Sequence, residues 1–295
     1  MMEHPLDLDC SRWRSILFVP ALNDRYVTKA CTSNADAIQL DLEDSILPAD
    51  KEGARAALPA AASRLRDAGK AISVRVNQPL ELAVADIRAA VAINAAAIML
   101  PKVEGASHVR LIDEMVGRME HECGQEVGRL RFIVVVETPG AYAKMREIFS
   151  ASPRIRGAML GGEDFSTACE CEPSEDVLLH YKQEMVVAAR AAGVNPLGTV
   201  GSIAGFADLN AYEQMVRRSK SMGFHGTTCI HPTQVDVINA VYRLDLTDIA
   251  HARRIVEAAQ DAAEKGVGAF RLDGHMIDAP IIKRAQMALQ RAASA

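Results

Sequence analysis

The sequence predicts an α/β protein of the (β/α)8, or TIM, barrel class with a C-terminal helical extension. Eight short apolar segments of strand length alternate with longer segments whose composition favours helices. The alternation extends over about 250 residues, a length typical of this barrel, and no glycine-, proline- or serine-rich linker interrupts it. A doubly wound sheet is the alternative, but no predicted strand leads into the G-x-G-x-x-G turn of dinucleotide-binding folds.

The predicted strands are Ser15–Val19, Ala37–Leu42, Ile72–Val76, Ala97–Leu100, Phe132–Val136, the segment that starts at Gly157, Asn195–Val200 and Gly226–Ile230. The predicted helices between them are Asn23–Asn34, Ala49–Ala68, Glu81–Ile93, Ala106–His121, Ala141–Phe149, Glu175–Ala192 and Phe206–Met222. We expect Asn23 to cap the first helix, because its side chain can accept a hydrogen bond from a free backbone N–H. Gly193 is expected to end the helix Glu175–Ala192.

The segment beyond the eighth unit predicts an extension of the barrel. Thr247–Lys265 is a long amphipathic stretch, Gly266–Gly274 is punctuated by glycine, and Pro280–Ala293 predicts a final helix. We therefore expect a barrel domain over residues 1–245 and a helical extension, or lid, over residues 246–295. Such an extension packs on the protein's own surface or reaches a neighbouring subunit.

The composition is that of an ordinary globular enzyme, with 49% hydrophobic and 24% charged residues in a chain of 295. The net charge of -5 gives no electrostatic reason to expect nucleic acid or an anionic membrane as a partner. No apolar run approaches the roughly 20 residues needed to cross a bilayer. The N-terminus lacks the pattern of a secretory signal, so we expect a cytoplasmic protein whose six cysteines are free thiols.

Two predicted strands lead directly into acidic residues. The stretch R-F-I-V-V-V-E-T-P-G ends its apolar run at Glu137, and G-A-M-L-G-G-E-D-F leads through two glycines to Asp164. An unpaired carboxylate is costly to bury, so each acid should lie at the mouth of its strand. Hard carboxylate ligands without nearby histidine or cysteine favour Mg²⁺, which keeps water or substrate oxygens as its other ligands.

Other polar side chains also fall at the ends of predicted strands. The full set is Asp41, Glu43, Arg75, Lys102, Glu137, Asp164 and His231. A solvated rim of ion pairs is one interpretation, but carboxylates and cations alternating around one opening favour an active site. Arg75 is suited to a two-pronged contact with a substrate carboxylate. With a metal ion it would hold an anionic, oxygen-rich substrate and stabilise an enolate or alkoxide.

An ordered set of motifs resembles the citrate lyase β-subunit/HpcH-HpaI aldolase family. The set comprises R-S-I-L-F-V-P (Arg14–Pro20), D-L-E-D (Asp41–Asp44) with Lys51 and Arg55 behind it, V-R-V-N (Val74–Asn77), M-L-P-K (Met99–Lys102), V-E-T (Val136–Thr138), G-G-E-D-F (Gly161–Phe165), I-H-P-x-Q (Ile230–Gln234) and D-G-x-M-I-D (Asp273–Asp278). The chain departs from the family's usual pattern at Ala21, where glycine is common, and at His275, where lysine is frequent.

The resemblance implies a (β/α)8 barrel that cleaves or forms a carbon–carbon bond next to an acyl-CoA thioester with Mg²⁺. It implies Glu137 and Asp164 as metal ligands and Arg14 and Arg75 as substrate contacts. We add Glu43 and Lys102 to the expected substrate contacts, and Asp41 and Arg75 to the expected catalytic residues. The resemblance also implies a homotrimer or hexamer in which a C-terminal aspartate, here Asp278, serves a neighbouring active site. The alternative for Asp278 is a simple N-cap of the last helix.

Three functions remain open at this stage. The first is a Mg²⁺-dependent lyase of citryl-CoA or malyl-CoA type, with an acyl-CoA or a small carboxylic acid as substrate. The second is a metal-dependent aldolase acting on free 2-keto acids such as pyruvate. The third is a non-catalytic subunit that keeps the fold, against which the retention of Arg75, Glu137, Asp164 and Asp278 counts.

Overall fold

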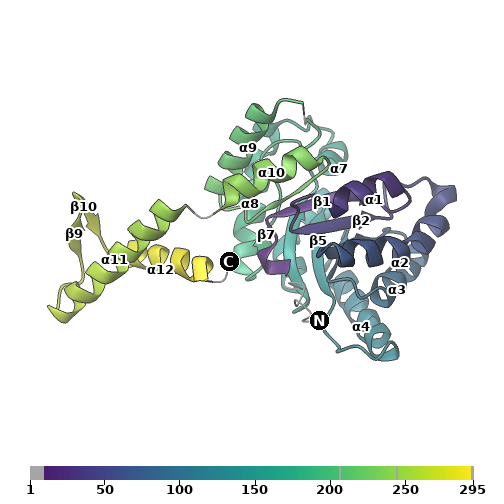
Figure 1. Cartoon of the computed structure of the whole chain (residues 1–295), viewed down its shortest axis with the longest axis horizontal. Helices are drawn as coiled ribbons and strands as arrows, with labels where there is room; N and C mark the ends of the chain where they lie inside the picture. The colour runs from purple at the N-terminus through teal and green to yellow at the C-terminus, as the bar shows by residue number, and fades with distance from the viewer. Residues whose placement is uncertain (1–9, 206, 244, 294–295) are drawn as a thin grey trace. The chain divides into compact units, whose positions relative to one another are not determined.

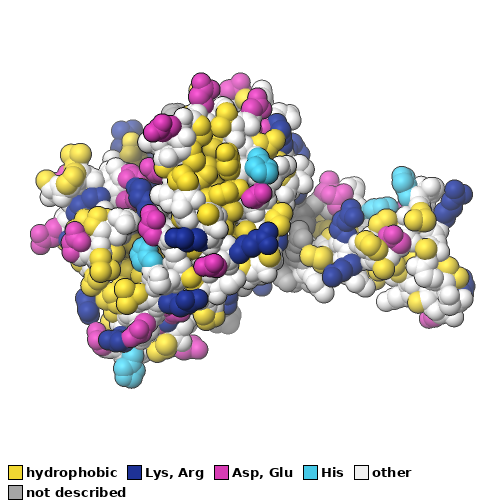
Figure 2. All heavy atoms as spheres, turned by 180° about the vertical axis from the view of Figure 1, so that it is seen from behind, with side chains coloured by type: hydrophobic (Ala, Val, Ile, Leu, Met, Phe, Trp, Pro, Cys, Tyr) yellow, Lys and Arg dark blue, Asp and Glu magenta, His cyan; other side chains and the backbone are white. Residues whose placement is uncertain are grey.

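The computed structural model describes residues 10–205, 207–243 and 245–293 (Figure 1). The chain forms two compact units, Met1–Tyr242 and Arg243–Ala295. In the described part of the chain, no helix is both long and apolar enough to cross a membrane. On the face shown in Figure 2, lysine and arginine side chains are interspersed with aspartate and glutamate rather than gathered in a field of one sign.

The first unit is a ring of parallel strands, which confirms the predicted barrel. The strands are β1 (Ser15–Pro20), β2 (Ala37–Asp41), β3 (Ala71–Arg75), β4 (Ala97–Leu100), β5 (Arg131–Val136), β6 (Ile155–Leu160), β7 (Asn195–Pro196) and β8 (Thr227–Cys229). Their order is β7-β6-β5-β4-β3-β2-β1-β8, with every neighbouring pair parallel. A parallel bridge between Leu197 and Gly226, directly beside β7 and β8, closes the ring.

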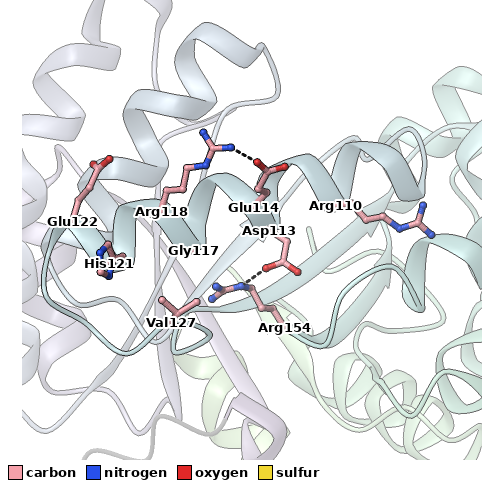
Figure 3. Close-up of a pocket in the computed structure, with 9 residues that line it drawn as sticks. All are labelled: Arg110, Asp113, Glu114, Gly117, Arg118, His121, Glu122, Val127 and Arg154. Atoms are coloured by element: carbon pink, nitrogen blue, oxygen red, sulfur yellow. Dashed lines mark hydrogen bonds and ion pairs between the residues drawn. The ribbon is translucent and has the colours of Figure 1, made fainter.

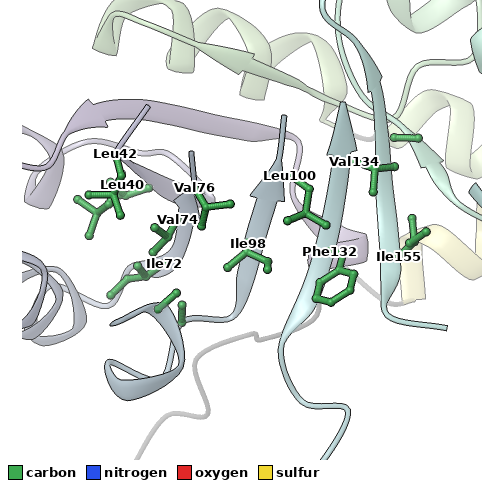
Figure 4. Close-up of a cluster of buried hydrophobic side chains, with 14 of the residues drawn as sticks. Leu40, Leu42, Ile72, Val74, Val76, Ile98, Leu100, Phe132, Val134 and Ile155 are labelled. Carbon is green, nitrogen blue, oxygen red and sulfur yellow. The ribbon is translucent and has the colours of Figure 1, made fainter. Parts of the chain in front are cut away.

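The strands are apolar on both faces, as their β-branched runs predict. The outer faces pack against the helices through a cluster that includes Leu40, Leu42, Ile72, Val74, Val76, Ile98, Leu100, Phe132, Val134 and Ile155 (Figure 4). The interior holds a smaller cluster that includes Ile16, Met99, Ile133, Val135 and Leu197, and Trp13 joins it from the segment before β1. Because both faces are buried, only the strand ends remain for charged side chains.

The helices follow the predicted alternation. They are α1 (Asp24–Cys31), α2 (Lys51–Asp67), α3 (Leu80–Ala92), α4 (Ala106–Glu122), α5 (Pro139–Tyr142), α6 (Met145–Phe149), α7 (Gly162–Ala168), α8 (Glu175–Ala191), α9 (Leu209–Ser221) and α10 (Pro232–Tyr242), with short 3-10 turns at Cys10–Arg12 and Pro48–Asp50. Asn23 caps α1 as predicted, since its side chain accepts a hydrogen bond from the Tyr26 N–H at 3.2 Å. Gly193 follows the end of α8 with φ +71°, the left-handed conformation expected of it.

Four element predictions differ from the structure. The predicted helix Ala141–Phe149 is two short helices, α5 and α6. The predicted helix Phe206–Met222 starts at Leu209 behind an Asp208 cap, and Phe206 itself lies outside the described residues. The predicted strand Asn195–Val200 is only two residues long, because from Leu197 the chain pairs with Gly226 instead of continuing along β6, and Gly198 follows with φ +128°. The acids after β6 lie in a helix, α7, which the sequence analysis missed.

The second unit is helical, as predicted, and contains an unpredicted hairpin. Helices α11 (Leu246–Glu264) and α12 (Ala279–Ala293) flank the antiparallel strands β9 (Phe270–Leu272) and β10 (His275–Ile277). Their small core gathers Ala252, Ile255, Ile277 and Ala285. Asp273 and Gly274 join the two strands with φ +50° and +80°, the positive values that a type I′ turn requires. The Asp-Gly pair was the sequence signal for this hairpin.

Closure of the barrel depends on Gly226. A Cβ on Gly226 would lie 2.4 Å from the backbone oxygen of Arg14, so β8 reaches β1 only because this residue lacks a side chain. We predict that Gly226→Ala lowers the free energy of unfolding by about 2 kcal/mol or more, since the overlap is with backbone. Gly140→Ala, which would meet nothing within 4 Å, should be neutral or slightly stabilising. Equal urea midpoints for both variants would contradict this account.

Candidate active site at the carboxyl ends of the strands

The site begins where β2 and β3 end side by side. Asp41 and Arg75 are the last residues of these strands and pair in register. The Arg75 Nε and Nη2 atoms donate to the two Asp41 oxygens at 2.7 and 2.8 Å, a two-pronged contact. The sequence predicts that this fork contacts a substrate carboxylate, whereas in the structure it binds Asp41. The Arg75 Nη1 atom points instead to Glu43 at 3.0 Å and to Asp44 at 3.4 Å.

Glu43 connects the arginine to the next cation around the opening. Its carboxylate, only 7% exposed, also accepts a hydrogen bond from the Lys102 Nζ atom at 2.8 Å. Lys102 follows β4 and has φ +49°, a left-handed conformation that a side chain other than glycine rarely adopts. This conformation aims the Lys102 backbone N–H at Glu137 Oε2, 2.6 Å away. Contacts therefore run without a break from Asp41 through Arg75, Glu43 and Lys102 to Glu137.

Among the acids at this opening that form no salt bridge with a described residue, Glu137 is the most buried. It follows β5 directly and is 6% exposed. Burial, helped by the nearby carboxylates of Glu43 and Asp164, raises its pKa to about 8 against the lowering effect of Lys102. Gly161, at the end of β6, makes room for this side chain, because a Cβ there would lie 2.6 Å from the Glu137 Oε1 atom.

Asp164 lies in α7, the helix that follows β6, the strand next to β5. It is exposed in the first turn of α7, and its charge raises the pKa of both Glu137 and Lys102, so it faces the same opening. The next residue, Phe165, is buried between the rings of Tyr142 and Tyr181, with ring centroids 5.5 and 5.1 Å away. This aromatic packing fixes α7 against α5 and α8.

The pKa values of the buried acids move in opposite directions. Burial alone would raise the pKa of Asp41, but its hydrogen bonds with Arg75 hold it below the usual value. Burial raises the pKa of Glu43 despite Arg75 and Lys102. The site thus combines a carboxylate held in its charged form, Asp41, with Glu137, whose pKa of about 8 lets it hold a proton near neutral pH, an arrangement typical of proton-transfer sites.

Arg14 does not join this group in the structure. Arg14 precedes β1, and its Nε and Nη2 atoms bind Asp36, which precedes β2, at 2.9 and 2.8 Å. Both residues therefore lie at the amino ends of the strands, opposite the site. Asp278 belongs to the second unit, where it precedes α12 and its Oδ1 atom lies 3.5 Å from the Ile281 N atom. His231, after β8, is half-buried and contacts Thr233 through Nδ1 at 2.7 Å.

A cavity of about 680 Å³ lies elsewhere on the barrel, along the outer face of α4 (Figure 3). Its lining is Arg110, Asp113, Glu114, Gly117, Arg118, His121, Glu122, Val127 and Arg154. None of these lining residues belongs to the strand-end site. Arg154, which precedes β6, forms ion pairs with Asp113 and Glu120. Ion pairs on a helix surface account for most of its lining, and we assign it no part in the chemistry.

The fold and the site together define the class of this chain. It is a (β/α)8 barrel with carboxylates and cations gathered at the carboxyl ends of β2 to β6. The family model for HpcH/HpaI aldolase/citrate lyase matches residues 14–232. The chain therefore belongs to the HpcH/HpaI aldolase/citrate lyase family, as the motifs predicted.

Two groups of relatives match nearly the whole chain. Citrate lyase subunit beta of Escherichia coli strain K12 is 35% identical over 285 residues, which cover 95% of this chain and 93% of that protein. The L-malyl-CoA/beta-methylmalyl-CoA lyase of Cereibacter sphaeroides strain ATCC 17029 / ATH 2.4.9 is 32% identical over 302 residues, 95% of this chain and 94% of that protein.

Solved structures agree with this membership. Protein CitE from Mycobacterium tuberculosis, in complex with magnesium, acetoacetate and coenzyme A, is 29% identical with a TM-score of 0.75, over 96% of this chain and 98% of that one. A citrate lyase from Burkholderia xenovorans LB400 has a TM-score of 0.83 at 19% identity, over 95% of this chain and 92% of that one, and supports the fold alone.

The raised pKa of Glu137 predicts a pH-dependent stability in protein stripped of divalent cations. The folded state holds a proton on Glu137 up to about pH 8, whereas the unfolded chain releases it near pH 4.5, so this group's contribution falls as pH rises through that window. Relative to wild type, Glu137→Gln should gain on the order of a few kcal/mol between pH 5 and pH 9, because glutamine never ionises. Urea unfolding with EDTA measures the difference. A difference that does not change with pH would contradict the assigned burial effect.

Proposed function

We propose that this chain is a Mg²⁺-dependent carbon–carbon lyase that cleaves or forms a bond next to an acyl-CoA thioester, of citryl-CoA or malyl-CoA type. The observation that carries the proposal is the convergence of Glu137 and Asp164, from the ends of adjacent strands, beside the cations Lys102 and Arg75. The named relatives act on such substrates, and one neighbour's structure contains magnesium, acetoacetate and coenzyme A.

The residues present fit a magnesium ion. Glu137 and Asp164 are hard oxygen ligands, and the lack of a side chain at Gly161 lets the Glu137 carboxylate take its position at the end of β5. Within the described residues, no three acidic, histidine or cysteine side chains cluster tightly enough to enclose a metal by themselves. Two carboxylates with the remaining positions open suit Mg²⁺, which keeps water and substrate oxygens as ligands. Held there, the ion would supply Lewis-acid stabilisation of an oxygen that gains charge in the reaction.

The cations supply the rest of the electrostatics in this proposal. Arg75 stays charged, and its contact with Asp41 fixes the plane of the guanidinium, so Nη1 is presented at the opening. Glu43 forms a salt bridge with both Arg75 and Lys102 and so fixes the positions of the two cations relative to each other. Asp41 thus acts by orienting Arg75, and Glu43 and Lys102 border the substrate. Because Arg14 binds Asp36 at the other end of the strands, we no longer assign it a substrate contact.

The second unit is proposed to complete the site. We assign Asp278 the transfer of a proton to or from the α-carbon or the substrate hydroxyl, a task for a carboxylate in a site closed to water. The extension would act as a lid over the barrel mouth of a neighbouring copy in a homotrimer or hexamer. A cytoplasmic location agrees with these substrates, and we propose no nucleic acid or membrane partner.

A panel of CoA thioesters, incubated with and without Mg²⁺ and analysed by mass spectrometry, tests the function. We expect cleavage of a citryl-CoA or malyl-CoA type substrate only when Mg²⁺ is present. Cleavage of free 2-keto acids with no binding of CoA in a titration would instead establish the aldolase. Absence of turnover on both classes, with folded protein and bound Mg²⁺, would indicate the non-catalytic subunit.

The two proposed metal ligands give the first test by substitution. Glu137→Gln and Asp164→Asn should each abolish Mg²⁺-dependent turnover, because each removes a ligand charge while keeping the side-chain volume. Glu163→Gln is the matched control, since Glu163 is adjacent to Asp164 but binds Ser202 at 2.9 Å. Wild-type Mg²⁺ affinity and rate in either ligand variant would show that the metal assignment is wrong.

Arg75→Lys tests whether the arginine acts through its geometry. Lysine keeps the charge but cannot make the two-pronged contact with Asp41, so its position would no longer be fixed. We predict that Arg75→Lys loses nearly as much kcat/KM as Arg75→Ala. Full activity in the lysine variant would show that only diffuse charge is needed.

Asp278→Asn separates catalysis from helix capping. Loss of a cap alone costs about 1 kcal/mol of stability and spares the chemistry. Loss of a proton-transfer group should lower the rate by a factor on the order of 100 or more. The 3.5 Å contact with the Ile281 N atom is long for a hydrogen bond, so the stability change should be small.

Mixing inactive chains tests whether the site is shared between copies. Asp278→Asn chains combined with Glu137→Gln chains should recover part of the activity after re-assembly, since some sites then receive both intact residues. If re-assembled mixtures stay inactive, Asp278 does not serve a neighbouring site.

A further inference from the structure

Lys51 contacts the backbone directly behind the site. Its Nζ atom donates to the backbone oxygens of Leu42 and Glu43, at 2.8 and 2.7 Å. These two residues join the end of β2 to the site, because Glu43 is the acid that binds Arg75 and Lys102. Both bonds go to backbone oxygens, whereas the Glu43 carboxylate contacts Arg75 and Lys102. Lys51 therefore acts on the backbone that carries this acid rather than on its carboxylate.

The location of Lys51 has no local explanation. It is the first residue of α2, where the positive end of the helix dipole disfavours a cation by about 0.3–1 kcal/mol. The side chain is half-buried, and ordering a long lysine also costs entropy. Both effects oppose its placement, so the two charge-assisted hydrogen bonds to Leu42 and Glu43 are what hold it there.

A second route from the same helix reaches the same segment. Arg55, one turn further along α2, binds Asp86 at 2.9 Å, and Asp86 is completely buried. Asp86 Oδ2 accepts hydrogen bonds from the backbone and side-chain nitrogens of Asn77, at 2.9 and 2.6 Å. The Asn77 side chain also donates to the Leu42 oxygen at 2.8 Å. The Leu42 oxygen thus receives two donors, one directly from α2 and one through α3.

The segment after Leu42 is a turn whose backbone N–H groups bind the Asp41 side chain and the Glu43 oxygen. The Glu43 N–H donates to Asp41 Oδ1 at 3.0 Å, and the Ser45 N–H donates to Asp41 Oδ2 at 3.2 Å. The Glu43 oxygen accepts the Ile46 N–H at 2.9 Å in addition to Lys51. Removing Lys51 would take one of two donors from the Leu42 oxygen and one of two from the Glu43 oxygen, which would loosen the backbone that carries the Glu43 carboxylate.

We propose that Lys51 is a positioning residue for the active site. It fixes the backbone of Leu42 and Glu43, so that the Glu43 carboxylate holds Arg75 and Lys102 at their working positions. The catalytic part of this inference rests on the proposed lyase function. The positioning part rests only on the contacts of Lys51.

Lys51→Met removes the ammonium and keeps much of the side-chain length. Lys70→Met is the matched control, because Lys70 is also half-buried and donates to a backbone oxygen, that of Ser33, but precedes β3 at the opposite end of the strands. Lys51→Arg is the rescue variant, since arginine can also donate to two oxygens.

Hydrogen exchange of the Glu43 and Ser45 amides, followed by NMR, gives a readout that does not depend on activity. We expect exchange to become about 10-fold faster or more in Lys51→Met, the change expected from losing hydrogen bonds to a charged donor. It should remain unchanged in Lys70→Met and return toward wild type in Lys51→Arg. Unchanged exchange in Lys51→Met would overturn the proposal, whatever the activity. If Lys51→Met does not fold, Lys51→Gln takes its place with the same expectation.

Steady-state kinetics test the catalytic part. On the thioester that wild type cleaves, kcat/KM should fall about 10-fold or more in Lys51→Met while melting temperatures stay within the range of Lys70→Met. Lys51→Arg should recover most of the loss. A wild-type rate in Lys51→Met would overturn the catalytic part. If wild type cleaves no thioester but the amides exchange faster in Lys51→Met, the proposed function fails and the positioning role stands.

Discussion

The binding of two cations by one buried carboxylate, that of Glu43, is the interaction on which the site depends. Arg75 and Lys102 follow from different strands and, as two cations at one opening, would repel each other without a carboxylate between them. Glu43 contacts both within 3.0 Å and is itself shielded from water. Removing a partner from such a group leaves an uncompensated charge, which is strongly destabilising in a buried site. The arrangement therefore constrains the strand ends of β2, β3 and β4 together.

The same constraint explains the unusual backbone at Lys102. Its left-handed conformation is unfavourable for a side chain other than glycine, and such strain persists where surrounding contacts determine it. Here the side chain binds Glu43 while the N–H binds Glu137, so one residue links the cation network to the proposed metal ligand. The proposed chemistry uses this linkage, because a change in charge at Glu137 is felt by Lys102 and, through Glu43, by Arg75.

The sequence predicted the barrel because its signals were periodic and local: apolar runs, helix-length spacers and caps such as Asn23. It also identified the strand-end acids, since a carboxylate after a buried run can lie only at the mouth. It failed where three-dimensional pairing decides. The sequence does not show that Asp41 forms the two-pronged contact with Arg75, or that Asp36 binds Arg14 at the other end of the strands. Lys51 and Gly161 fall within the family motifs, but the sequence does not show their roles, which come from close approach to Glu43 and Glu137.

The central claim is that Glu137 and Asp164 hold one divalent cation beside Lys102 and Arg75. An anomalous difference map from crystals soaked in Mn²⁺, a common substitute for Mg²⁺, tests it most directly. We expect one strong peak about 2.1 Å from carboxylate oxygens of both Glu137 and Asp164, with waters completing the shell. A fully occupied peak elsewhere, such as at Cys169 and Cys171, with none between the two carboxylates would contradict it.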